Sequence, residues 1–192
     1  MPFLPAWIPV SVAIVLSAMP NSLYMFHVKR QERIMKTLLS TLFLVISMIS
    51  TCQASEKAVN EVLDSVHHSA AKANAEHYFS LFSADAVFIG TDASEVWTVS
   101  EFKDYAMPHF NKGTGWTYHP YNRHVYFSDD GDVAWFDELL RNDKLGITRG
   151  TGVLEKKEGN WKVMQYHLAI PVPNAIAGDV ADQIKAIEKG GH

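Results

Sequence analysis

An α+β fold is predicted from the order of two kinds of pattern along the chain. Apolar residues first recur at helical spacing, and four β-type runs joined by short turn signals then fill the last third. No repeat, low-complexity segment or linker divides this part of the sequence. We therefore expect one domain in which helices pack against an antiparallel sheet.

The first 54 residues have the pattern of a leader rather than of a domain. Lys36 supplies a positive charge, residues 38–49 form an apolar run, and residues 52–54 (Cys-Gln-Ala) resemble a small-x-Ala cleavage site. We therefore predict a signal peptide over residues 35–54. Residues 1–34 do not fit this design, and we interpret them as an upstream extension from a start codon assigned too early.

The predicted leader places the protein outside the cytoplasm, either secreted or periplasmic, with a domain over residues 55–192. An uncleaved anchor is the main alternative, but the apolar run is shorter than the ~20 residues that span a bilayer. A lipid on Cys52 is a second alternative, although Thr51 is bulkier than the residues that lipoprotein signals favour at that position. We expect no stable membrane anchor after cleavage.

Composition limits the classes of partner. The chain has 192 residues, 47% of them apolar and 20% charged, which is enough material for the core of one domain. Cleavage would remove Cys52, the single cysteine, and with it any disulfide or thiolate chemistry. It would also remove four of 17 basic and one of 21 acidic residues, which leaves a net charge of −7. This charge argues against nucleic acid and anionic membrane surfaces.

Two helices are predicted at the start of the domain. The second and shorter one covers residues 77–82. The first covers residues 56–73, and its core-facing stripe is Val59, Val62, Leu63, Val66 and Ala70.

The rest of the domain is predicted to contain a short strand, a helix, four longer strands and a last helix. Residues 86–89 form the short apolar strand, and the chain turns after it toward residues 95–97. A capping box from Thr98 to Glu101 begins a helix, which Pro108 should kink or end. Four strands are predicted at residues 116–127, 132–140, 147–156 and 161–170, followed by a last helix at 175–189.

This order resembles the SnoaL-like domains of the nuclear transport factor 2-like superfamily. The resemblance covers residues 58–174 and rests on residues 84–88 (Ala-Asp-Ala-Val-Phe), 134–138 (Ala-Trp-Phe-Asp-Glu), 149–154 (Arg-Gly-Thr-Gly-Val-Leu) and the last strand. It implies N-terminal helices packed on a curved antiparallel sheet that forms a cone. The superfamily includes isomerases, dehydratases and members that only bind or assemble, so the resemblance does not imply one reaction.

Period-two alternation assigns the strand residues to two faces. With a two-residue turn at 158–159 and an even register across the preceding loop, Glu138 lies opposite Arg149. The mostly apolar face is assigned to the concave side: Arg123, Val125, Phe127, Ala134, Phe136, Glu138, Arg149, Thr151, Val153, Met164, Tyr166 and Leu168. The other face, which in relatives often packs against a second subunit, collects Asn122, His124, Tyr126, Trp135, Asp137, Gly150, Gly152, Gln165 and His167.

The first candidate site is the polar end of this concave face. Glu138, Arg149 and Arg123 would meet there, and a partly desolvated Glu138 could act as a general base. A cation beside it would lower its pKa again, so a structural ion pair is the alternative. The proposed ligand-binding residues are Arg123, Phe136, Arg149, Met164, Tyr166 and Leu168.

The second candidate site is the pair of Asp137 and His167, which would flank Gly150 on the other face. A carboxylate can orient an imidazole for acid–base work. Two strand spacings of ~4.8 Å separate the two backbones, so contact would be indirect. The alternative is a histidine held in a subunit interface.

Other histidines and aromatic residues give weaker signals. His67 and His68 are adjacent on a helix and point apart, and no spacing typical of a metal site appears, so we predict no metal. No phosphate-binding or nucleotide motif is present, so we predict no cofactor. Four residues could cover the cavity mouth or belong to the core: Tyr78, Trp97, Tyr105 and His109.

Three functions remain open from the sequence. The first is an exported protein that holds a small, largely apolar molecule in its cone and forms a homodimer through the outer sheet face. The second is a cofactor-independent lyase or isomerase that uses a carboxylate or histidine base. The third is a non-catalytic assembly domain whose cone is filled by its own side chains.

Overall fold

The computed structural model describes residues 21–190, and the first 20 residues of the predicted upstream extension lie outside that range. The chain divides into two units, residues 1–51 and 52–192. Helix α2 (Asn21–Ala71) begins well before the predicted residue 56, because neither proline nor glycine interrupts this stretch. Between residues 21 and 190, no helix combines the length and the apolar character needed to cross a membrane. Signal-peptide cleavage stays a prediction.

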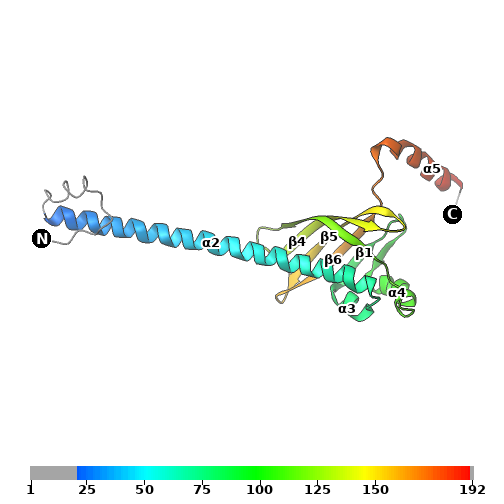
Figure 1. Cartoon of the computed structure of the whole chain (residues 1–192), viewed down its shortest axis with the longest axis horizontal. Coiled ribbons are helices and arrows are strands. Elements are labelled where there is room, and N and C mark those ends of the chain that lie inside the picture. Colours follow the sequence, from blue (N-terminus) through cyan, green and yellow to red (C-terminus); the bar gives the residue numbers. More distant parts are fainter. Residues whose placement is uncertain (1–20, 191–192) are drawn as a thin grey trace. The chain divides into compact units, whose positions relative to one another are not determined.

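Short helices follow α2 in the second unit (Figure 1). Asn74 caps α3 (Ala75–Ser80) by accepting a hydrogen bond from the backbone N–H of His77. The predicted capping box is confirmed at the start of α4 (Val99–Phe110), where Thr98 and Glu101 satisfy each other's backbone N–H groups. Pro108 lies in the last turn of α4, so the helix ends where the sequence predicts.

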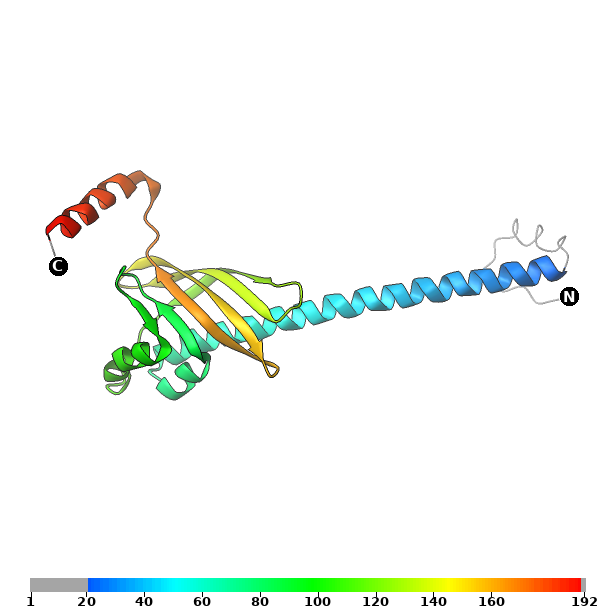
Figure 2. The same ribbon diagram turned by 180° about the vertical axis from the view of Figure 1, so that it is seen from behind.

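Six strands form one curved, open sheet (Figure 2). Their order is β2-β1-β6-β5-β4-β3, and β1 runs parallel to β6, so the sheet is mixed rather than wholly antiparallel as predicted. The α+β fold itself is confirmed. The strands are β1 (Phe82–Ile89), β2 (Val96–Thr98), β3 (His119–Phe127), β4 (Val133–Asn142), β5 (Gly146–Lys157) and β6 (Asn160–Ala169).

The core of the second unit lies between the helices and one face of the sheet. Val59, Leu63, Val66 and Ala70 from α2 are buried there, as their helical spacing predicts. Strand residues complete it, and the most buried of these are Ala134, Leu140, Leu154 and Val163. The opposite face is more open: Tyr126 and Trp135 are nearly half exposed and stack on each other at 6.0 Å.

The pairing of β4 with β5 differs from the predicted register by one residue. Asn142 pairs with Gly146, so a three-residue loop joins the strands where an even register was expected. Glu138 therefore lies opposite Gly150 and not opposite Arg149. Because side chains alternate along a strand, this shift moves Arg149 to the outer face, where it is exposed.

A second one-residue shift occurs between β5 and β6. The predicted two-residue turn at 158–159 is confirmed, but a β-bulge at Met164 changes the register beyond it. The two shifts cancel across β5, so Tyr166 and Leu168 do face the helices as predicted. β5 is inverted, and so is β6 before the bulge: Gly150, Gly152, Leu154 and Val163 face inward, and Arg149, Thr151 and Val153 face outward.

The chain after β6 forms a 3₁₀ turn (Asn174–Ile176) and α5 (Ala177–Gly190). This agrees with the helix predicted over residues 175–189. None of the α5 residues is buried, and Ile184 and Ile187 are more than half exposed.

Candidate functional site

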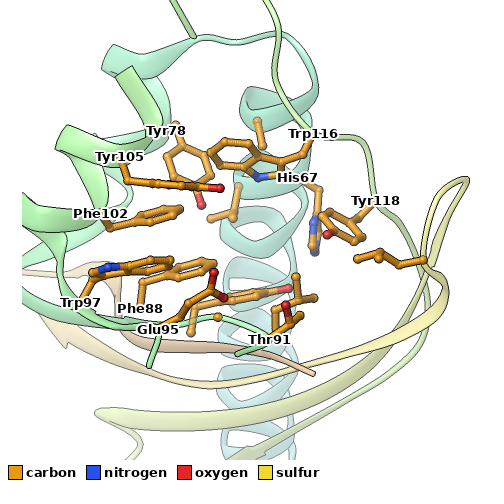
Figure 3. A pocket seen from close by; sticks show the side chains of 16 residues that line it. His67, Tyr78, Phe88, Thr91, Glu95, Trp97, Phe102, Tyr105, Trp116 and Tyr118 are labelled. Carbon is orange, nitrogen blue, oxygen red and sulfur yellow. The ribbon is translucent and has the colours of Figure 1, made fainter. Parts of the chain in front are cut away.

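A cavity of about 230 Å³ lies in the second unit between the helices and the concave face of the sheet. Every helix that packs on this face contributes to it, as do β1, β2, β6 and three loops (Figure 3). The lining residues are Val66, His67, Ala70, Tyr78, Phe88, Gly90, Thr91, Glu95, Trp97, Phe102, Tyr105, Trp116, Tyr118, Leu145, Tyr166 and Leu168.

Half of the lining residues are aromatic, and several of their rings lie nearly parallel. Phe88 stacks on Phe102 with centroids 3.9 Å apart and planes 3° apart, and Trp97 stacks on Tyr105 at 5.2 Å. Figure 3 shows this stack along one side of the cavity, with His67 and Tyr118 on the other side. Such walls bury a flat apolar molecule over much of its surface.

His67 is the buried imidazole at the edge of this cavity. It lies on the apolar stripe of α2, four residues after Leu63 and three before Ala70, so the helix directs it at the sheet. Its Nε2 is 2.7 Å from Oε1 of Glu138. Among residues 21–190, Nδ1 of His67 makes no hydrogen bond. Glu138 therefore orients the imidazole through Nε2, and Nδ1 is available to a ligand.

Glu138 on β4 is the centre of the polar network behind His67. Its carboxylate is fully buried, and it accepts hydrogen bonds from Nε of Arg123 at 2.7 Å and from the hydroxyl of Tyr166 at 3.1 Å. Burial alone would raise the pKa of Glu138, but His67 and Arg123 outweigh it and lower that pKa below its usual value. Glu138 is therefore ionised and held, which does not favour a direct role as a base.

Arg123 closes this network on the side away from the cavity. A β-bulge lies between Tyr121 and His124, and Arg123 within it extends toward α2. There its Nη1 donates to the side chain of Asn60 at 3.0 Å and pairs with Asp64 at 2.8 Å. Desolvation lowers the pKa of Arg123, but its carboxylate partners outweigh this and raise it. The positive charge thus balances Glu138.

Gly150 makes the contact between Tyr166 and Glu138 possible. Tyr166 is on β6 and Glu138 on β4, so the tyrosine must cross β5 to reach the carboxylate. A Cβ at Gly150 would lie 2.5 Å from the Tyr166 hydroxyl and 3.0 Å from Oε1 of Glu138. Burial and the nearby Glu138 carboxylate raise the pKa of Tyr166 well above its usual value, which keeps the hydroxyl protonated as a donor.

The residues predicted for the first candidate site are only partly brought together. Arg123 and Glu138 meet as predicted, and Tyr166, which was predicted only as a ligand contact, also binds Glu138. Tyr166 and Leu168 line the cavity. Phe136 is buried beside Tyr166 rather than on the cavity wall. Two predicted ligand contacts lie elsewhere, because the register shifts move them: Arg149 on the outer face and Met164 at the bulge.

The residues of the second candidate site do not meet on the outer face. Asp137 is 3.3 Å from Nδ1 of His124, its direct neighbour on β3. Asp137 and His167 are separated by Thr151 of β5, where the sequence predicted Gly150. No cavity residue comes from this face.

His67 was not predicted as a site residue, although its position carried a signal. A histidine on the apolar stripe of a helix must find a polar partner when it is buried. The sequence left open whether four residues cover the cavity mouth or belong to the core. Three of them, Tyr78, Trp97 and Tyr105, line the cavity. Within residues 21–190, no three residues of the types that bind metals form a group that could hold an ion.

Comparison with known families agrees with this architecture. The model of the SnoaL-like domain matches residues 59–173, which is more than half of the chain. The chain therefore belongs to the SnoaL-like domain family. No match was found among curated proteins.

Solved structures with nuclear transport factor 2-like folds are similar to this chain. One of unknown function from Pseudomonas putida is 15% identical, with a TM-score of 0.55, and the match covers 64% of this chain and 90% of that one. A provisionally named scytalone dehydratase from Novosphingobium aromaticivorans is 14% identical, with a TM-score of 0.55 and coverages of 64% and 88%. A provisionally named dehydratase from Streptomyces avermitilis is 16% identical, with a TM-score of 0.52 and coverages of 63% and 99%. These identities show a common fold alone.

Proposed function

We propose that this SnoaL-like protein is exported and binds a small, largely apolar, planar molecule in the aromatic cavity, with His67 as a polar contact. The observation that carries the proposal is an aromatic-lined space of about 230 Å³ bordered by an imidazole that a buried carboxylate orients. An engineered apolar cavity of ~150 Å³ holds benzene, so this space suits one or two rings. It also argues against a cone filled by its own side chains.

Native mass spectrometry tests the binding proposal. The full chain is expressed so that it can be exported, purified without organic solvent, and weighed before and after denaturation. A reproducible mass difference that matches an aromatic small molecule in the extract supports the proposal. Phe102→Ala, which removes a cavity wall, should lose that molecule, whereas Trp135→Ala on the outer face should retain it. Retention by both variants would place the molecule outside the cavity.

A second function, a lyase or isomerase without a cofactor, is favoured by the contact between His67 and Glu138. In the neutral form of His67, a proton on Nε2 would bind the Glu138 carboxylate, and Nδ1 would keep its lone pair. Nδ1 can then take a proton from carbon beside a carbonyl, and Glu138 stabilises the imidazolium that forms. Returning the proton to another carbon gives an isomerase, and passing it to a hydroxyl group that leaves the neighbouring carbon as water gives a dehydratase.

Deuterium exchange tests this second function without a known substrate. 2-Tetralone is a compact ketone with one aromatic and one saturated ring and acidic protons beside its carbonyl, and NMR follows their exchange in D₂O. A His67 base predicts faster exchange with the protein, and His67→Phe should lower the enzymatic rate by about 10²-fold or more. His124→Phe on the outer face is the matched control. Equal rates for wild type and His67→Phe would exclude His67 as the base.

The outer sheet face supports a proposed homodimer. Tyr126 and Trp135 form an exposed aromatic pair there, beside the partly exposed pair of His124 and Asp137. Light scattering after gel filtration measures the mass in solution. A dimer that dissociates in Trp135→Asp supports this interface, and a monomeric wild type would contradict it.

A further inference from the structure

Glu95 is the charged group of the aromatic cavity. It lies in the loop between β1 and β2, one residue before β2 begins, and it lines the cavity together with Gly90 and Thr91. Glu95 is the one carboxylate among the lining residues, and His67, which contacts Glu138, is the one basic side chain among them. Figure 3 shows its carboxylate rising from the loop beside Trp97 and Phe88, with His67 on the far side.

The loop holds this carboxylate in place. Oε2 of Glu95 accepts a hydrogen bond from the backbone N–H of Asp92 at 3.1 Å. The backbone N–H of Gly90 donates to the carbonyl of Glu95 at 2.9 Å and closes the loop. Gly90 has no Cβ, and one added there would collide with the Glu95 side chain. Glycine therefore allows Glu95 to fold over the end of β1 into the cavity.

Among residues 21–190, Glu95 forms no ion pair. Glu138, by contrast, has both Arg123 and His67. The surrounding walls are aromatic rings, whose faces are electron-rich. A carboxylate beside such rings is the combination that attracts organic cations, because both the charge and the ring faces favour a positive group.

We propose that Glu95 makes the cavity selective for molecules that join a positively charged amine to a small aromatic body. The aromatic body would occupy the space between the ring stack and His67, and the ammonium group would lie against Glu95. This inference rests on the proposed binding function and specifies the chemical class of its ligand.

A matched pair of probes tests the selectivity on the full chain as it is purified. Phenethylamine is protonated at neutral pH, and 2-phenylethanol has the same shape with a neutral hydroxyl group. Isothermal titration at pH 7 and low salt measures both dissociation constants. We expect wild type to prefer the amine by about tenfold or more, which is the order expected for a partly desolvated cation next to a carboxylate and aromatic rings.

Three variants separate the role of Glu95 from general electrostatics. Glu95→Gln keeps the side-chain shape and should bring the ratio of the two constants near one, with the affinity for 2-phenylethanol within about twofold of wild type. Gly90→Ala keeps the carboxylate but displaces it, so it should also reduce the preference. Asp104→Asn removes an equal charge from an exposed site on α4 and should leave the preference unchanged.

The outcomes distinguish this inference from the binding proposal on which it rests. If 2-phenylethanol binds and wild type shows no preference for the amine, or Glu95→Gln keeps the preference, the role of Glu95 is overturned and the binding proposal stands. If neither probe binds, both are overturned. Equal loss of preference in Asp104→Asn and Glu95→Gln would attribute the effect to net charge and overturn the specific role of Glu95. Melting temperatures close to wild type exclude misfolding as the cause.

Discussion

Two carboxylates on the concave side of the same sheet differ in their burial and in their charged partners. Glu138 is fully buried and accepts from His67, Arg123 and Tyr166, so its charge is balanced within the protein. Glu95 is partly exposed, borders the aromatic cavity and accepts from one backbone N–H of its own loop. A balanced carboxylate holds other groups in place, and one without a counter-charge is available to a ligand. The difference fits a structural role for Glu138 and supports the proposed role of Glu95 in recognition.

The largest expected effect comes from breaking the network at its centre. Glu138→Gln removes the buried carboxylate that pairs with Arg123 and leaves only the exposed Asp64 as its charged partner, so we expect the free energy of unfolding to fall by about 3–5 kcal/mol. Urea denaturation followed by circular dichroism measures the loss. Asp137→Asn, the neighbouring residue on the outer face, should change it by less than about 1 kcal/mol. Similar values for both would mean that the network contributes little to stability.

Acid should weaken the same network. The pKa of Glu138 is below its usual value in the folded protein, so its contribution to stability is complete above the unfolded pKa of about 4.3. That contribution is lost as the pH falls through the folded pKa. We therefore expect the free energy of unfolding of wild type to decline more steeply below about pH 4.5 than that of Glu138→Gln. Parallel declines would indicate that other carboxylates control acid unfolding.

A smaller effect is expected from filling the gap over β5. Gly150→Ala places a methyl group against the Tyr166 hydroxyl and should cost about 1–3 kcal/mol. Tyr166→Phe removes that hydroxyl, so the cost of Gly150→Ala should be smaller when it is introduced into Tyr166→Phe. The coupling in this double-mutant cycle measures the contact directly. Additive losses would mean that Tyr166 does not cross the sheet at Gly150.

The smallest effect is expected at Arg149. Its side chain is exposed on the outer face, away from Glu138, so Arg149→Ala should change the free energy of unfolding by no more than about 0.5 kcal/mol. The Arg149→Ala variant should bind 2-phenylethanol with the same affinity as wild type. A loss above about 1 kcal/mol would contradict this position and support the ion pair between Glu138 and Arg149 that the sequence predicted.

The sequence predicts most of the elements because caps, turns and periodicity act locally. It cannot fix the register of β5, which depends on whether the loop after β4 holds an odd or even number of residues and on the bulge at Met164. The two shifts cancel, so Glu138 and Tyr166 were assigned to the correct face although the strand between them was inverted. This is why Arg123 was correctly predicted beside Glu138, Tyr166 was placed on the correct face, and Arg149 was wrongly added.

The remaining site residues depend on contacts that no local pattern encodes. His67 meets Glu138 across 71 positions of the chain, so the sequence shows a histidine on an apolar stripe but not its partner. Glu95 reaches the cavity because the loop folds its side chain over Gly90, which is a property of the loop conformation. Helical and strand periodicity do not report on such a loop.

The indole N–H signals of the tryptophans report directly on whether a ligand enters the aromatic cavity. Trp97 and Trp116 line the cavity, whereas Trp135 is exposed on the outer face, so one NMR titration with 2-phenylethanol carries its own control. Single Trp→Phe variants assign the signals. If the aromatic cavity holds the ligand, Trp97 and Trp116 should show saturable shifts and Trp135 none. Shifts confined to Trp135, or none at concentrations where titration detects binding, would contradict it.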